Sequence, residues 1–114
     1  PAEPWDAVVS NSLLHHLADP ATLWDTIAQH APRTAAIFVM DLLRPPSPAA
    51  VRALAERHAA DAPEILKRDF TSSLHAAYRP EEIRHQIERA GLGHLQIEVV
   101  SDRHLVVWGK REGR

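Results

Sequence analysis

The sequence contains no cysteine among its 114 residues. That absence excludes disulfide bonds, thiolate zinc sites and cysteine nucleophiles together. The sequence also lacks any apolar run close to the roughly 20 residues that would span a bilayer, and no charged-then-apolar leader for export can be recognised. We therefore expect a cytoplasmic protein that does not bind a membrane.

An excess of charge of one sign is missing too. The 13 Lys and Arg residues nearly balance the 15 Asp and Glu residues, and the basic residues are scattered along the chain. A surface that follows a nucleic-acid backbone needs a basic stripe, so nucleic acid is not an expected partner. The apolar content of 45% at this length is typical of one globular domain with a modest core.

Hydrophobic patterns and helix-breaking residues divide the chain into strands and helices. Continuous apolar runs, and an alternating pattern near the end, predict strands at 7–10, 35–40, 95–100 and 104–109. Capping residues and proline in the first turn predict helices at 20–30, from 48, at 61–74 and at 80–90. Because the first two strands have few polar positions, we expect both of their faces to be covered.

This order of elements predicts an α/β fold. Right-handed crossovers make the first three strands parallel, and the last strand returns antiparallel in a hairpin, which gives the order first, second, fourth, third. Ligands of open α/β sheets bind outside the carboxyl ends of the strands. This rule points to the loops at 11–16, 41–47 and 101–104, and we expect Asp41, His16 and His104 to converge there in one accessible region.

The first of these loops carries the most informative motif. A strand runs there into a polar loop with two histidines, in the order Asp6-Ala7-Val8-Val9-Ser10-Asn11-Ser12-Leu13-Leu14-His15-His16-Leu17. This segment resembles the signature that follows the fourth sheet strand of class I S-adenosylmethionine-dependent methyltransferases. The resemblance covers Trp5 to Lys110, because a helical cap, an Arg-Pro-Glu-Glu helix start and a terminal hairpin also match that family's second half.

The resemblance implies that residues 1–114 are the carboxyl-terminal half of a three-layer Rossmann-like methyltransferase domain. The half-sheet would be mostly parallel with a terminal antiparallel hairpin strand, and a helical cap would be inserted at about 48–78. The family's glycine-rich loop and ribose-binding acid cannot be placed here, since Gly91-Leu92-Gly93 follows a helix rather than a strand. The expected activity is methyl transfer from S-adenosylmethionine to a small-molecule acceptor by the parent protein, with this piece inactive alone.

The resemblance also assigns residues to the cofactor. Asn11 and Ser12 would lie beside the methionine part of S-adenosylmethionine, together with His15; alternatively, Asn11 and Ser12 only cap the next turn. The two adjacent histidines diverge by about 100° on a helical turn, so they are not expected to share a metal ion. His16 is taken as the catalytic base, although either histidine could face the cleft while the other packs on the sheet.

The remaining candidates follow the second and third strands. Asp41 ends an apolar strand, where a partly desolvated carboxylate suits proton abstraction from a hydroxyl or amine; the alternative is an ion pair with Arg44 or Arg103. Arg44, Tyr78, Arg103 and His104 are assigned to substrate binding, and for Tyr78 the alternative is half-buried core.

Two other functions stay open. A strand at 7–10 without its preceding neighbours has one unpaired edge, so we expect a homodimer formed through it. A non-enzymatic, self-assembling α/β half-domain is therefore the main alternative to an enzyme. A hydrolase that uses His15 or His16 is the weaker alternative, because the sequence has no G-x-S-x-G nucleophile elbow.

Overall fold

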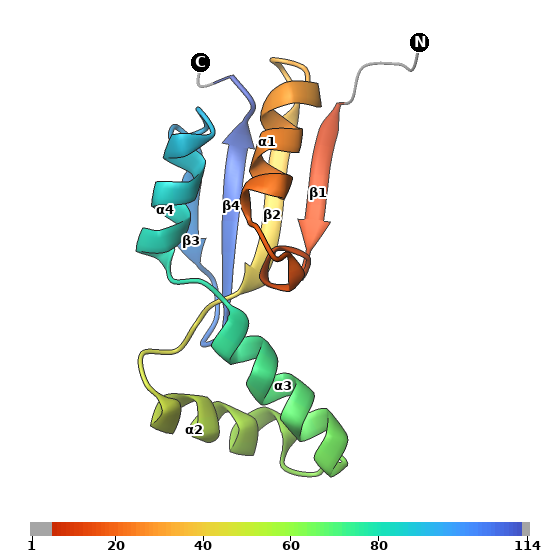
Figure 1. Ribbon diagram of the computed structural model, residues 1–114, viewed down its shortest axis with the longest axis vertical. Helices are drawn as coiled ribbons and strands as arrows, with labels where there is room; N and C mark the ends of the chain where they lie inside the picture. Colours follow the sequence, from red (N-terminus) through yellow and green to blue (C-terminus); the bar gives the residue numbers. More distant parts are fainter. Residues whose placement is uncertain (1–5, 113–114) are drawn as a thin grey trace.

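The structure is a computed structural model that describes residues 6–112, so Trp5 lies outside the described part. Within that range the chain forms an α/β fold with an open four-stranded sheet and four α-helices (Figure 1). The strands are β1 (Ala7–Asn11), β2 (Ala36–Leu42), β3 (Gln96–Val99) and β4 (His104–Lys110). The helices are α1 (Ala21–His30), α2 (Pro48–Ala59), α3 (Glu64–Ala76) and α4 (Pro80–Arg89), with a short 3-10 turn, η1 (Leu14–His16).

The sheet has the order β1-β2-β4-β3, as the sequence predicts. β1 and β2 are parallel, and β4 runs antiparallel to both β2 and β3. Three strands therefore share one direction and β4 opposes them, which confirms the predicted terminal hairpin. The register places Phe38 of β2 between Val9 of β1 and Trp108 of β4.

Short polar residues and glycine set the helix ends. The Asp19 carboxylate accepts a hydrogen bond from the Ala21 backbone N–H at 2.9 Å, just before α1. The Ser47 hydroxyl accepts one from the Ala50 N–H at 3.1 Å, with Pro48 in the first turn of α2. Gly91 follows α4 with φ of +79°, a left-handed conformation that glycine adopts without strain. Among the described residues, no helix is long and apolar enough to cross a bilayer.

Helices α2 and α3 follow β2 and precede α4 in the chain, and they pack on each other as a helical hairpin. The hairpin lies beyond the carboxyl ends of β1 and β2 (Figure 1). The hairpin has its own small core of Val51, Leu54 and Leu74, against which Leu42 and Phe70 pack. Its position in the chain matches the helical insertion expected at about 48–78. The second helix is continuous from Glu64, because Pro63 precedes it rather than interrupting it.

The main core lies between the sheet and helices α1 and α4. Its buried members include Trp24 and Ile27 of α1, Ile83 and Ile87 of α4, and Ile37, Val39, Leu105 and Val107 of the sheet. The indole N–H of Trp24 donates to the side-chain oxygen of Gln86 at 2.9 Å, which links α1 to α4. Both helices therefore cover the same face of the sheet (Figure 1).

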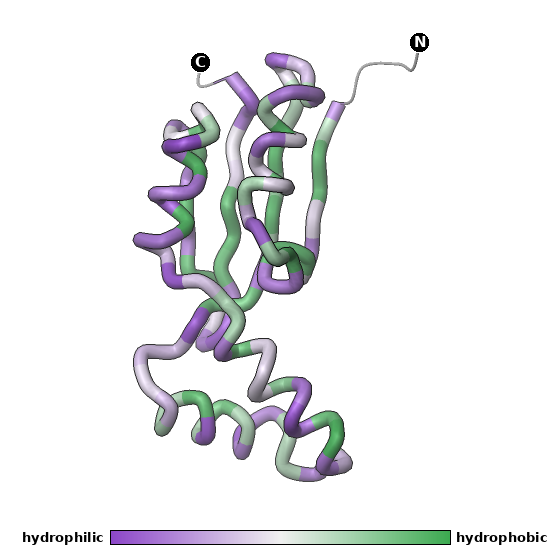
Figure 2. Tube along the Cα trace, viewed as in Figure 1, coloured by the Kyte–Doolittle hydropathy of each residue, from purple (hydrophilic) through white to green (hydrophobic). Residues whose placement is uncertain are grey.

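The expectation of three layers is wrong for the described residues, which form one sheet and one helical layer. The side chains of Val9, Phe38 and Trp108, on the face opposite α1 and α4, are 71%, 42% and 41% exposed. Figure 2 shows hydrophobic residues along β1, β2 and β4. Continuous apolar runs predict strands covered on both faces, yet within residues 6–112 only one face is covered.

Candidate functional site

Asn11 and Ser12, at the end of β1, are exposed to solvent. Ser12 has φ of +62°, a left-handed conformation that is uncommon for a residue other than glycine and that often marks functional turns. Its backbone N–H donates to the Met40 carbonyl at 2.9 Å, and its hydroxyl donates to the Asn11 side-chain oxygen at 2.9 Å. Neither side chain caps η1, so the alternative capping role is wrong, and both side chains are exposed at the end of β1.

Asp41 is a buried carboxylate that joins this turn to β2. Its side chain is almost fully buried, and its Oδ2 accepts a hydrogen bond from the Leu14 N–H at 2.7 Å. Its Oδ1 accepts one from the Leu42 N–H at 2.8 Å and lies 2.5 Å from Nδ1 of His15. A buried charge is tolerated when it is hydrogen-bonded in this way. Asp41 thus contacts η1 rather than solvent.

The pairing with Asp41 orients the His15 ring. An ionised carboxylate only accepts hydrogen bonds, so we assign a proton to Nδ1 of His15. In the neutral form of a ring held in this way, Nε2 is the acceptor. A carboxylate that fixes a neutral imidazole in this tautomer prepares it to take a proton from a ligand. The pair therefore places a potential general base at the carboxyl end of the sheet.

His15 and His16 line a hollow of about 360 Å³ between η1 and α3. Its other lining residues, Asp69, Ser72, Ser73 and Ala76, all come from α3. The two imidazole rings lie 4.0 Å apart between centroids, with His15 buried and His16 exposed. The loop after β1 and the helical hairpin thus form one hollow, whose lining includes imidazole, carboxylate and hydroxyl groups.

The two arginines assigned to substrate binding have other carboxylate partners. Arg44 forms an ion pair with Glu82 at 2.8 Å, and Arg103 forms one with Asp102 at 2.9 Å. The alternative in which Asp41 pairs with Arg44 or Arg103 is therefore wrong. Asp41 is bonded to His15 instead.

Asp102 is the centre of a polar cluster that sequence reasoning missed. Its carboxylate contacts His58 Nε2 at 3.1 Å and Arg57 at 2.8 Å, and so connects α2 to the β3–β4 turn. Hydrogen bonds from His58, then Arg103 and Arg57, hold the pKa of Asp102 well below its usual range. No local sequence pattern indicates this cluster, because Arg57 and His58 of α2 lie 45 and 44 positions from Asp102 in the chain.

Tyr78 and His104 are partly buried. Burial raises the pKa of the Tyr78 phenol, and the carboxylate of Glu82 raises it further. Burial also lowers the pKa of His104, with a further lowering by the charge of Arg103. The hydroxyl of Ser101 lies 2.9 Å from Nδ1 of His104.

The expected convergence of Asp41, His16 and His104 is wrong, although the strand direction behind it is right. His104 pairs with Leu42 in the register, so it lies at the same end of the sheet as Asp41. Neighbouring strand positions alternate between faces, and Asp41 pairs with buried Leu105 on the face that α1 and α4 cover. His104 lies on the other face, so the accessible hollow contains His15 and His16 without His104.

The comparisons with known proteins add no assignment to this geometry. No family model matches the chain, and a search of the curated proteins finds no similar sequence. Across residues 6–112, no three histidine or acidic side chains are grouped as a metal site would require.

The substitution Asp41→Asn tests the buried carboxylate. The carboxylate of Asp41 accepts hydrogen bonds from Leu14, Leu42 and His15, whereas the asparagine side chain has only one oxygen to accept them. Its amide N–H₂ group would face a donor, so we expect the free energy of unfolding to fall by about 2 kcal/mol or more. Urea unfolding followed by circular dichroism measures this change. Asp69→Asn, at an exposed position of the same hollow, is the matched control and should change it by less than about 0.5 kcal/mol. Equal losses in both variants would contradict the role given to Asp41.

His104 predicts a pH dependence of stability. Its pKa in the folded state lies below the ordinary value of 6.5, so protonation favours the unfolded chain. The contribution of His104 to the free energy of unfolding is present above pH 6.5 and is lost as the pH falls through its folded-state pKa. Urea midpoints measured from about pH 7.5 to about pH 5 should fall less in His104→Gln than in the wild type. His85→Gln, at an exposed position on α4, should retain the wild-type slope; an unchanged slope in His104→Gln would disprove the prediction.

Proposed function

We propose that this chain supplies the acceptor side of an S-adenosylmethionine-dependent methyltransferase that acts on a small molecule. The observation that carries the proposal is the order β1-β2-β4-β3 with a polar loop after β1. This is the layout that the resemblance of the Asp6–Leu17 segment implies for the carboxyl-terminal half of the class I domain. The helical hairpin after β2 fits the expected substrate cap.

The cofactor contacts that the chain offers are Asn11 and Ser12. Their side chains are exposed at the carboxyl end of β1, where open α/β sheets bind ligands, and the left-handed backbone of Ser12 holds the turn in a specific shape. S-adenosylmethionine would supply an electrophilic methyl group on a sulfonium centre. The 114 residues contain no glycine-rich loop after a strand, so we expect binding through these two residues to be weak.

His15 is the base that the geometry favours, in place of His16. Nδ1 of His15 is bonded to Asp41, and the ring borders the hollow beside Ser72 and Ser73. In this proposal the hydroxyl groups and Asp69 hold a polar acceptor, Nε2 of His15 takes its proton, and Asp41 acts as a positioning residue. General-base assistance contributes about 10²- to 10⁴-fold, and alignment of the acceptor supplies the rest.

A self-assembling module without enzymatic activity is the second candidate. β1 is at one edge of the sheet and pairs only with β2 among the described strands. Such an edge is a template for another chain. Cofactor binding distinguishes the candidates, because an assembly module has no need to bind S-adenosylmethionine.

The test is a titration of the ¹⁵N-labelled chain with S-adenosylmethionine, followed by NMR. We expect a dissociation constant weaker than about 100 μM, well short of the roughly −8 kcal/mol of a micromolar complex. The shifts should centre on residues 11–16, and adenosine, which lacks the methionine part, should not produce them. Asn11→Ala should weaken binding, whereas Gln96→Ala on exposed β3 should not. Low-micromolar binding would contradict the partial pocket, and no shifts at millimolar cofactor would contradict the proposed function.

A further inference from the structure

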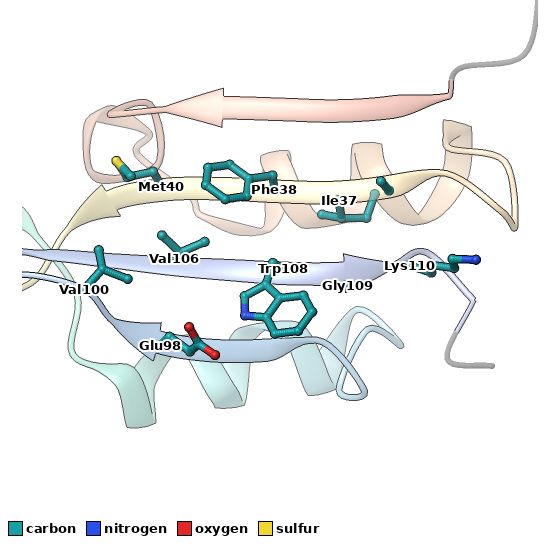
Figure 3. Close-up of a pocket in the computed structure, with 10 residues that line it drawn as sticks. Ile37, Phe38, Met40, Glu98, Val100, Val106, Trp108, Gly109 and Lys110 are labelled. Atoms are coloured by element: carbon teal, nitrogen blue, oxygen red, sulfur yellow. The ribbon is translucent and has the colours of Figure 1, made fainter.

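The sheet face opposite α1 and α4, called here the open face, has an apolar centre. It carries Phe38, Met40, Val100, Val106 and Trp108, with Glu98 and Lys110 near its two ends (Figure 3). Val9 of β1 pairs with Phe38 and extends this face. The residues from β2, β3 and β4 line a hollow of about 740 Å³. Large contiguous apolar patches of this kind mark interaction surfaces on proteins.

The register shows how the open face is arranged. Val9, Phe38 and Trp108 are paired across three neighbouring strands, so they form one row. Glu98 pairs with Val106, two residues before Trp108 on β4, while Lys110 is two residues after Trp108. The two charges therefore lie on opposite sides of the row (Figure 3). Within residues 6–112, neither side chain has an ion-pair partner.

We propose that the open face packs against the open face of a second copy of this chain. The two-fold axis would lie between the two sheets, perpendicular to the strands, over the row of Phe38 and Trp108. Such an axis reverses strand direction but keeps each strand opposite its own copy. It brings Phe38 and Trp108 against their symmetry mates, and it places Glu98 of each chain beside Lys110 of the other.

Charge complementarity selects this arrangement. An axis parallel to the strands would place β3 opposite β1 of the other copy, where Glu98 would face the Asn11 position and find no cation. The perpendicular axis instead forms two ion pairs at the rim and buries an apolar centre. That distribution is typical of self-complementary interfaces and of sheets that pack face to face about 10 Å apart.

Pairing through the edge of β1 is the competing form of self-association. The Asp6 carbonyl accepts from the Ala36 N–H, and the Ser12 N–H donates to the Met40 carbonyl, so even-numbered residues of β1 bond to β2. The N–H of Val9 therefore points to the free edge. Val9→Pro removes that donor but retains an apolar side chain on the open face, so it separates the two forms.

Sedimentation equilibrium of the 114-residue chain over a dilution series at low salt tests the proposal. We expect a monomer–dimer equilibrium that weakens as salt rises. Glu98→Lys and Lys110→Glu should each raise the dimer dissociation constant about tenfold, since each places like charges together twice. The double variant, with the charges exchanged, should return it to within about threefold of the wild type.

Two controls make the outcome decisive. Glu56→Lys makes the same charge change at an exposed position on α2 and should leave the dissociation constant unchanged. Circular dichroism checks that each variant is folded. A protein concentration of about 0.5 mM lies far above the dissociation constants typical of specific complexes. A wild-type chain that is still monomeric at this concentration would overturn the proposal. A double variant without recovery, or dimers lost only in Val9→Pro, would do the same.

Discussion

The carboxylate of Asp41 is the contact on which the rest of the site depends. It accepts hydrogen bonds from the backbone of Leu14 in η1 and of Leu42 in β2, and it is bonded to His15. These bonds hold the loop after β1 over the end of the neighbouring strand. A buried charge that is satisfied by three donors leaves little freedom to the groups that it holds. The position of His15 at the hollow is a consequence of this burial.

The two faces of the sheet differ in how they are covered. One face forms the core with α1 and α4, and Leu14 of η1, next to His15, is part of the same core. The other face is apolar and uncovered within residues 6–112. The hollow at the carboxyl end and the open face are thus separate surfaces with no lining residue in common, so the ligand binding and the self-association proposed above would not compete for the same residues. The helical hairpin contributes only to the first surface.

Sequence patterns predicted most of the architecture because its signals are local. Asp19, Ser47 and Gly91 mark helix ends through bonds and dihedrals that involve near neighbours. The pairing of His15 with Asp41 spans 26 positions. The sequence marks both residues as site candidates, but no local pattern indicates their direct contact. Coverage of the sheet was overestimated, since an apolar run does not reveal whether anything packs on its second face; Val9 shows this most clearly.

The contact between Asp41 and His15 can be tested directly, because Asp41 accepts a hydrogen bond only from a protonated Nδ1. Long-range ¹H–¹⁵N correlation spectra of the histidine rings measure this directly at neutral pH. We expect these spectra to show a proton on Nδ1 of His15, held in its hydrogen bond to Asp41. A His15 ring whose Nδ1 carries no proton would contradict this contact.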